Sequence, residues 1–341
     1  MRSILVTGGA GFIGSHFVDF ILAAHRDYHV FVLDKLTYAG RRSNLHQAES
    51  AAGDRLTFVQ GDAGDTEIGC RLLRECDLVV HFASESHVVR STQDPMLFAR
   101  NNANNTALLL EATRQQGVKR FLLVSSVEVY GSSHQRVAPS REDDLVNPST
   151  PYAAAKVAVE AWASAYWQSY GLPVVVTRSC NNYGPRQHEE KQLPDVITMA
   201  RRGGPIRLQG DGGHVRQWMY VTDHCRALDL LLHADERLVV GETFNIGTGP
   251  GGERTTLQNA HAVLERLGKR CDITFGPDRV PSIRRLALDS SKLEKRLGWK
   301  PLVSFDEGLD RTLAFYCPEY VSRAHAPVTP AVDLPRQLAQ V

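Results

Sequence analysis

A glycine-rich turn directly follows the first apolar run of the chain. In the segment Gly8-Gly9-Ala10-Gly11-Phe12-Ile13-Gly14 the glycines have the spacing GxxGxxG. Gly8 permits a tight turn, Gly11 lets the backbone approach a pyrophosphate, and Gly14 lets the next helix pack closely on the strand. The pattern predicts a strand–turn–helix unit whose helix N-terminus binds an anion. We expect a dinucleotide to contact Gly8, Gly11, Phe12, Ile13 and Gly14.

Strand-like apolar runs alternate with helical patterns throughout the first 180 residues. The predicted strands are Ser3–Val6, Val30–Asp34, Leu56–Gln60, Leu78–Phe82, Phe121–Ser125 and Val174–Arg178. The predicted helices are Phe12–Ala24, Asn101–Gln116 and Pro151–Tyr170. Such alternation is typical of a parallel sheet with helices on both faces. The sequence therefore predicts an α/β fold with a doubly wound parallel sheet.

The composition changes after Cys180, where prolines and glycines separate shorter elements. We expect residues 1–180, with about 217–248, to form the sheet domain. Residues 181–216 and 249–320 would form a smaller C-terminal α/β lobe over the carboxyl edge of the sheet, where ligands bind in open α/β folds. Residues 324–341 contain three prolines and few large apolar groups, and they are predicted to be a poorly ordered tail.

Charge and cysteine usage narrow the range of partners. The net charge of +1 provides no general attraction to nucleic acid or to a membrane surface, and no stretch has the roughly 18 apolar residues of a membrane span. The six cysteines form no CxxC, and no Cys/His cluster has zinc spacing. We therefore expect a cytoplasmic protein with no metal site and no nucleic-acid or membrane partner.

Two carboxylates at strand ends indicate the cofactor. Asp34 ends the second predicted strand, 20 residues beyond Gly14. A carboxylate there accepts hydrogen bonds from the ribose hydroxyls of an adenosine and would repel a 2′-phosphate. NAD is therefore favoured over NADP, although Arg41 and Arg42 follow closely. Asp62 ends the third strand segment and is expected to reach the adenine.

Tyr152 and Lys156 have the spacing i, i+4 and share one face of a predicted helix. A neighbouring ammonium stabilises a phenolate and so lets a phenol act as a base, and it can also hold a nicotinamide ribose. Ser125 and Ser126 end a strand of the same predicted sheet, where a hydroxyl can hydrogen-bond the oxygen that is being oxidised. These residues are predicted to form a catalytic group.

The glycine-rich turn, the two serines and the Tyr152/Lys156 pair resemble the extended short-chain dehydrogenase/reductase family, and within it the dTDP-glucose 4,6-dehydratases. Further matching segments are 34–40, 81–87, 181–185, 190–191, 210–212 and 215–216, and the similarity extends from the first strand to about residue 301. The resemblance implies a Rossmann-type domain that holds NAD tightly. We expect additional cofactor contacts from Lys35, Thr37, Ala63, Phe82, Ala83, Ser84 and Ser125.

The resemblance also implies a reaction. In those dehydratases the tyrosine takes the C4 hydroxyl proton while hydride moves from C4 to NAD. A glutamate then removes the C5 proton, an aspartic acid protonates the departing C6 hydroxyl, and the hydride returns at C6. The glutamate corresponds to Glu128, Ser126 replaces the family threonine, and Val127 occupies the aspartate position.

Val127 leaves the outcome open, because a valine cannot donate a proton and general-acid catalysis typically contributes about 10²–10⁴ in rate. Either Glu85, His188 or a water supplies the proton, or the enzyme does not eliminate water. C5 deprotonation and reprotonation, or non-stereospecific hydride return to C4, would instead make the chain an epimerase. A non-catalytic NAD-binding protein is a third hypothesis, but the intact Tyr152, Lys156 and Ser126 argue against it.

The nucleotide half of the substrate is expected in the smaller lobe. Asn182 and Arg216 are predicted to hold the pyrophosphate, because a guanidinium matches phosphate geometry, with Arg284 or Arg285 as a second clamp. Further substrate contacts are expected from Glu85, Ser86, Glu190, Lys191, Gln209 and Asn245. The substrate is expected to be a dTDP- or UDP-hexose used in deoxysugar biosynthesis, although the family's aromatic residue beside Gly210 is absent. Members of this family often dimerise through helices equivalent to 101–116 and 154–170, so a homodimer is expected.

Overall fold

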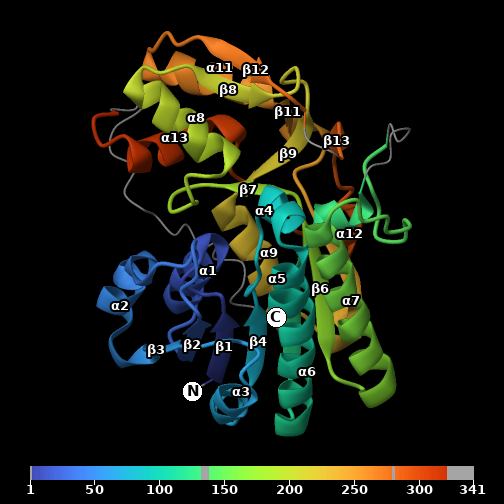
Figure 1. The fold of residues 1–341 in the computed structure, drawn as a ribbon. Coiled ribbons are helices and arrows are strands. Elements are labelled where there is room, and N and C mark those ends of the chain that lie inside the picture. Colours follow the sequence, from blue (N-terminus) through green and yellow to red (C-terminus); the bar gives the residue numbers. More distant parts are fainter. Residues whose placement is uncertain (1, 132–137, 279–280, 321–341) are drawn as a thin grey trace.

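The computed structural model describes residues 2–131, 138–278 and 281–320. Among them, seven parallel strands form one sheet in the order β10-β6-β5-β4-β1-β2-β3 (Figure 1). These strands are β1 (Arg2–Thr7), β2 (Tyr28–Asp34), β3 (Leu56–Gln60), β4 (Leu78–His81), β5 (Arg120–Ser126), β6 (Val174–Ser179) and β10 (Thr243–Ile246). The predicted α/β class and all six predicted strands are confirmed.

The sheet is covered by helices because its strands are apolar on both faces. All four residues of β4 and all six of β6 are buried, as expected for parallel strands between two helical layers. The covering helices include α1 (Phe12–Ala24), α2 (His46–Ala52), α3 (Thr66–Leu73), α6 (Asn105–Gln116), α7 (Pro151–Tyr170) and α9 (Val221–His233).

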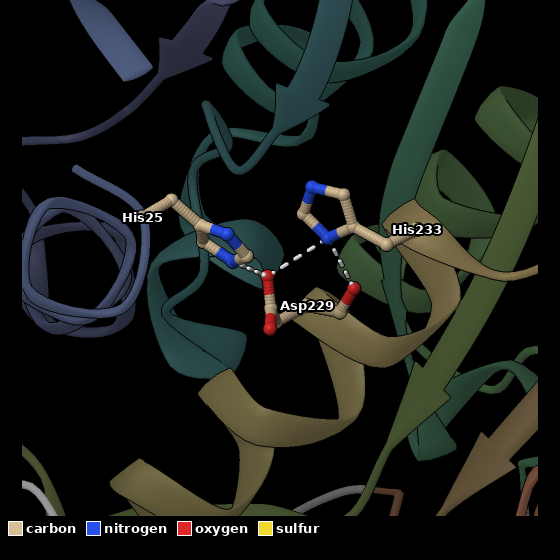
Figure 2. A group of neighbouring side chains, drawn as sticks. All are labelled: His25, Asp229 and His233. Atoms are coloured by element: carbon tan, nitrogen blue, oxygen red, sulfur yellow. Dashed lines mark hydrogen bonds and ion pairs between the residues drawn. The ribbon is translucent and has the colours of Figure 1, made fainter. Parts of the chain in front are cut away.

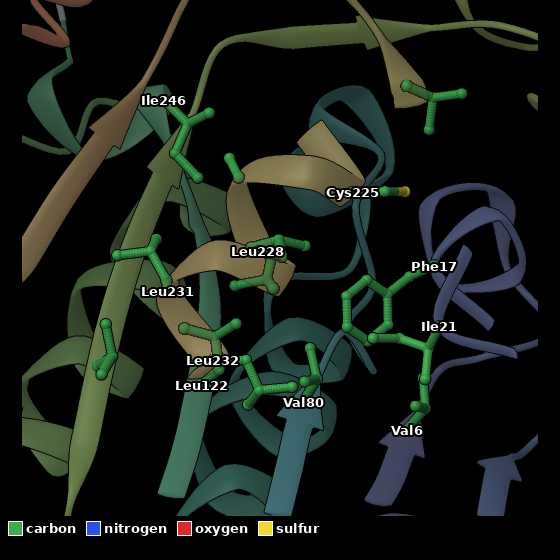
Figure 3. Close-up of a cluster of buried hydrophobic side chains, with 14 of the residues drawn as sticks. Val6, Phe17, Ile21, Val80, Leu122, Cys225, Leu228, Leu231, Leu232 and Ile246 are labelled. Carbon is green, nitrogen blue, oxygen red and sulfur yellow. The ribbon is translucent and has the colours of Figure 1, made fainter. Parts of the chain in front are cut away.

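Helices α1 and α9 pack side by side on one face of the sheet. Their C-terminal ends meet where His25 lies against Asp229 and His233 (Figure 2). Between the two helices and the strands, Phe17 and Leu228 belong to one continuous apolar cluster (Figure 3). Leu109, Phe121 and Val159 belong to the separate cluster on the other face.

Strand order reverses beside β1, because the chain proceeds from β1 to β2 and β3 on one side and through β4, β5, β6 and β10 on the other. Loops that leave β1 and β4 in opposite directions open a crevice at the carboxyl edge. This edge carries the glycine-rich turn after β1 and the residues that follow β4 and β5.

Local sequence signals account for both ends of α7. Helix α7 begins after Thr150, whose side chain accepts a hydrogen bond from the Ala153 N–H, and it ends at Gly171 in a left-handed conformation. The helix predicted over 101–116 is instead two elements: a π-helical segment, η3 (Ala99–Asn104), and then α6. Within η3, the amide of Asn102 bonds both the N–H and the carbonyl of Glu85.

The smaller lobe lies above the carboxyl edge of the large sheet in Figure 1. It contains β9 (Val215–Tyr220), paired with β7 (Asn181–Tyr183), β11 (Glu253–Thr255) and β13 (Arg285–Leu286), and a second pair of strands, β8 (Ile206–Gln209) and β12 (Ile273–Gly276). The helices packed around them are α8 (Gln192–Arg202), α11 (Thr256–Leu267) and α13 (Phe305–Tyr316). The chain returns to the large sheet through α9 and β10 between these elements.

Shorter helices complete the described chain: α4 (Val88–Gln93), α5 (Pro95–Phe98), α10 (Glu236–Val239) and α12 (Ser291–Leu297), with 3₁₀ segments that include η4 (Val127–Tyr130). Within the described ranges, no helix is long and apolar enough to cross a membrane. The tail predicted over 324–341 lies outside the described residues.

Candidate active site

A cavity of about 580 Å³ lies between the smaller lobe and the carboxyl edge of the large sheet. Its walls come from both parts of the chain. The predicted cofactor residues that line it are Gly8, Gly11, Phe12, Ile13, Gly14, Asp34, Lys35, Thr37, Asp62, Ala63, Phe82, Ala83, Ser84, Ser125, Tyr152 and Lys156. The predicted substrate residues that line it are Glu85, Ser86, Asn182, Glu190, Lys191, Gln209 and Arg216. Folding therefore brings most of the predicted site together.

The glycine-rich turn is packed tightly against the segment that follows β4. Gly8 has a φ of 70°, and a Cβ atom there would lie 2.6 Å from the backbone nitrogen of Ala83. A larger residue at Gly8 would be strained by its conformation and by this contact. The turn therefore holds backbone N–H groups at the start of α1, facing the cavity, where a pyrophosphate would bind.

Asp34 is buried at the end of β2. One carboxylate oxygen accepts from the Ala10 N–H at 2.9 Å and the other from the Leu36 N–H at 2.8 Å. Each oxygen retains a lone pair for a ribose hydroxyl. Lys35 and Asp62 form an ion pair of 2.6 Å beside it. The hydroxyl oxygen of Ser125 is also buried, and it has no hydrogen-bond partner among the described residues. These features fit a dinucleotide such as NAD.

Tyr152 and Lys156 face the same cavity from the first turns of α7 and are 8% and 6% exposed. Burial raises the pKa of Tyr152 to about 12, opposed by a hydrogen bond with Ser126, while the charge of Glu128 raises this pKa further. Burial lowers the pKa of Lys156 to about 8, opposed by the charge of Glu160. The ammonium is held by the Val124 carbonyl oxygen at 2.9 Å.

Glu128 follows β5 in the 3₁₀ segment η4, which Ser126 caps by accepting a hydrogen bond from the Glu128 N–H at 3.2 Å. Val127 lies between them, also lines the cavity, and is otherwise packed in the apolar cluster. The wall near Tyr152 thus combines a hydroxyl, a carboxylate and an apolar side chain.

The substrate end carries several polar groups on short segments. Glu85 is buried and accepts from the Asn101 amide at 3.3 Å, while Lys191 donates to the Ser86 carbonyl at 3.0 Å. Asn182 donates to the Cys180 carbonyl at 3.1 Å, and its side-chain oxygen is buried without a hydrogen-bond partner in the described part of the chain. That oxygen can accept a bond from a ligand.

Three predicted substrate residues are not among the described residues that line the cavity. Asn245 is fully buried. Its side-chain oxygen accepts from the Tyr130 hydroxyl at 2.8 Å, and its side-chain nitrogen donates to the Ser140 carbonyl oxygen at 2.9 Å. Arg284 pairs with Asp211 at 2.7 Å, and Arg285 pairs with Glu253 at 2.7 Å. In this structure both guanidinium groups are therefore paired with carboxylates of the smaller lobe, and their predicted role as a second pyrophosphate clamp stays a prediction.

The structure also adds cavity residues that the sequence interpretation missed. Tyr38 lies within a segment that carried the family resemblance, and Thr150 is a helix cap, so both had a local signal. Asn105, Arg207 and Trp218 had none, because they reach the cavity only through the packing of η3, α6 and the small-lobe strands.

A dinucleotide-type crevice beside a Tyr-x-x-x-Lys pair, with a smaller lobe above it, defines an extended short-chain dehydrogenase/reductase. Residues 5–312 match the sequence profile of a family described as GDP-mannose 4,6 dehydratase. The chain belongs to this family.

Relatives include both dehydratases and epimerases. The chain is 42% identical over 319 residues to a dTDP-glucose 4,6-dehydratase from Actinoplanes sp., covering 92% of this chain and 97% of that protein. It is 44% identical, with a TM-score of 0.87, to the crystal structure of DesIV, a dTDP-glucose 4,6-dehydratase from Streptomyces venezuelae with NAD bound, covering 92% and 97%. It is 32% identical, with a TM-score of 0.85, to a UDP-glucose 4-epimerase from Thermotoga maritima with UDP-glucose, covering 93% and 99%.

Proposed function

We propose that the chain is an NAD-dependent enzyme that oxidises C4 of a nucleotide-activated hexose and acts as a 4,6-dehydratase. Relatives that cover almost the whole chain are enzymes of this kind. The strongest support from this chain is the grouping of Tyr152, Lys156, Ser126 and Glu128 on one wall of the cavity. This grouping also argues against a non-catalytic binding protein.

NAD fits the residues at the β1 to β4 end of the cavity. The glycine-rich turn would hold its pyrophosphate, Asp34 its adenosine ribose and Lys156 its nicotinamide ribose. When bound, NAD supplies the hydride acceptor and a positive charge that favours the phenolate of Tyr152.

Tyr152 would remove the proton of the C4 hydroxyl, with Ser126 hydrogen-bonded to the same oxygen. Lys156, one helical turn away, would stabilise the phenolate that this step requires. Oxidation to a ketone at C4 acidifies the C5 proton, and Glu128 is the base positioned to take it.

Departure of the C6 hydroxyl needs an acid, and Val127 provides none. Glu85 and His188 both line the cavity, and His188 lies 3.8 Å from Glu190. We propose one of these groups, or a water, as the proton donor. Val127 is the specific observation that favours a second candidate function, epimerisation at C5 or C4, for which no such donor is needed.

The proposed substrates are dTDP- and UDP-hexoses. Support comes from the dTDP-glucose 4,6-dehydratases and from the UDP-glucose bound to the Thermotoga epimerase. In this chain Gln209 and Arg216 line the small-lobe part of the cavity, where a base and a pyrophosphate would lie. We also propose a homodimer formed through α6 and α7, on which Trp162 is 45% exposed.

The decisive experiment is mass spectrometry of the products formed from dTDP-, UDP-, GDP- and CDP-hexoses in deuterated water, with NMR of the same products to determine the sugar configuration and the labelled carbon. Loss of water with deuterium at C5 supports the dehydratase. Unchanged heavy-atom composition with deuterium at C5 identifies a C5 epimerase, and a changed configuration without deuterium identifies a C4 epimerase. Glu128→Gln should remove C5 labelling while C4 oxidation, followed by the absorbance of reduced nicotinamide, persists. Absence of turnover on all four nucleotides would reject the proposed substrate class.

A further inference from the structure

Two histidines and an aspartate meet at the edge of the sheet opposite the cavity. His25 follows the last residue of α1, while Asp229 and His233 lie one turn apart at the end of α9. Figure 2 shows both imidazole rings directed at the carboxylate between them. The same carboxylate oxygen, Oδ1, lies 2.8 Å from His25 Nε2 and 2.9 Å from His233 Nδ1. The three ligand atoms all lie within 4.8 Å of one another.

We propose that His25, Asp229 and His233 bind a divalent transition-metal ion of the Zn²⁺ class. Two neutral imidazoles and one carboxylate are a donor set typical of Zn²⁺, and they leave further positions for water. In a tetrahedral site with bonds of about 2.0–2.1 Å, neighbouring ligand atoms are about 3.3 Å apart. The two measured contacts with Asp229 would open by about 0.5 Å to admit the ion, and the two imidazole nitrogens, which lie within 4.8 Å of each other, would take the same spacing.

Metal binding requires a change of tautomer at His233. In the structure Nδ1 donates to the Asp229 carbonyl oxygen at 2.8 Å, because a carbonyl can only accept, and Nε2 lies 2.6 Å from the hydroxyl of Tyr28. An ion would replace the contact of Nδ1 with the carbonyl oxygen. Metal binding at Nδ1 requires the ring proton to reside on Nε2, where the Tyr28 oxygen can accept it. Hydrogen bonding of this kind to the remote ring nitrogen fixes the tautomer of most metal-bound histidines.

The cluster is open enough for an ion to enter. The side chains of His25, Asp229 and His233 are 26%, 12% and 23% exposed. The Asp229 carboxylate is therefore well shielded, while the two imidazoles border solvent. Shielding strengthens the attraction between the carboxylate and a cation, because water screens it less.

The position of the cluster gives the ion a structural role. His25 and Tyr28 precede and begin β2, whose seven residues span roughly 20 Å before they reach Asp34 at the cavity. A bound ion would join the ends of α1 and α9, which cover the same apolar cluster. We expect it to stabilise the fold and to leave turnover unchanged.

The test uses the full-length protein, freed of metal with a chelator and titrated with Co²⁺ and Zn²⁺. We expect one Co²⁺ per chain with visible absorption bands, displaced by Zn²⁺. With Zn²⁺ at about 100 times its Kd, the Tm should rise by about 4 °C. His25→Gln and His233→Gln should each lose the Co²⁺ bands and the Tm rise, while His261→Gln, an exposed histidine on α11, should behave as the wild type.

Tyr28→Phe provides a second test that retains all three ligands. We expect it to weaken metal binding about 10–100-fold, the usual effect of removing such a hydrogen bond. Identical Co²⁺ binding in the wild type and in the His25→Gln, His233→Gln double variant would overturn the proposal. So would the absence of Co²⁺ bands in the wild type, which would leave the cluster as a hydrogen-bonded contact between helices.

Discussion

Lys156 donates a hydrogen bond to the carbonyl oxygen of Val124 at 2.9 Å, and this contact joins the start of α7 to the end of β5. It holds a buried ammonium beside the cavity, one helical turn from Tyr152. The same burial lowers the pKa of Lys156 to about 8. The proposed catalytic lysine therefore lowers the stability of the fold, since the buried site disfavours its charged form.

Lys156→Met should stabilise the ligand-free protein while it lowers turnover by about 10²–10⁴. A pKa shift from 10.5 to about 8 means that burying the charged lysine lowers the free energy of unfolding of the wild type by about 3 kcal/mol. The variant recovers this amount but loses the hydrogen bond to Val124, which is worth about 1 kcal/mol.

The stability of the wild type should depend on pH, because the pKa of Lys156 is lower in the folded than in the unfolded state. Below pH 8 the lysine is charged in both the folded and the unfolded state, so the full cost of burying it is present. Between about pH 8 and 10.5 only the unfolded state keeps the proton, so wild-type stability should rise and the advantage of Lys156→Met should shrink. Denaturant unfolding at several pH values measures this. Lys295→Met, at an exposed position, should have no such effect.

Val127→Asp should increase the rate of water elimination, because it places a carboxyl group beside Glu128, at the position where the resemblance to the dehydratases implies an acid. The expected gain is about 10²–10⁴ if proton donation to the C6 hydroxyl limits the reaction. Val127→Asn is the matched control, since it has a similar shape and no acidic proton. Equal rates in both variants would mean that Val127 does not limit elimination. The measurement is the loss of water by mass spectrometry.

Asp34→Ala should abolish NAD retention. It removes the acceptor for two backbone N–H groups as well as the predicted ribose contact, so the free energy of unfolding should fall by about 1–3 kcal/mol. Chromatography of the nucleotide released from denatured protein measures the retained cofactor. Asp54→Ala, at an exposed position after α2, should retain as much NAD as the wild type. Undiminished NAD in Asp34→Ala would contradict the assigned orientation of the cofactor.

Trp162→Glu should convert the proposed homodimer to a monomer, because it introduces a charge into an apolar face of α7. Light scattering coupled to size-exclusion chromatography determines the mass in solution. Leu302→Glu changes an apolar residue of the other lobe that is more exposed, at 64%, and should leave the mass unchanged. A dimeric Trp162→Glu variant would place the interface elsewhere.

The local parts of this structure were predictable from the sequence. Strand β3 and helices α1 and α7 have their predicted boundaries, because apolar runs, helical periodicity and Pro151 in the first turn of α7 are features of neighbouring residues in the sequence. Tyr152 and Lys156 share a helix face for the same reason. The spacing of the glycines likewise predicts the turn after β1, because residues without a side chain allow the backbone to pack closely there.

Contacts between distant segments were decided only by the tertiary structure. The sequence predicted Arg285 as a pyrophosphate ligand. In the structure Arg285 on β13 pairs with Glu253 on β11, across the intervening strand β9. His25 and Asp229 are 204 residues apart, so the spacing of cysteines and histidines along the chain gave no sign of their meeting. Secondary structure depends on short-range sequence periodicity, whereas the partner of a charged side chain depends on which distant elements pack beside it.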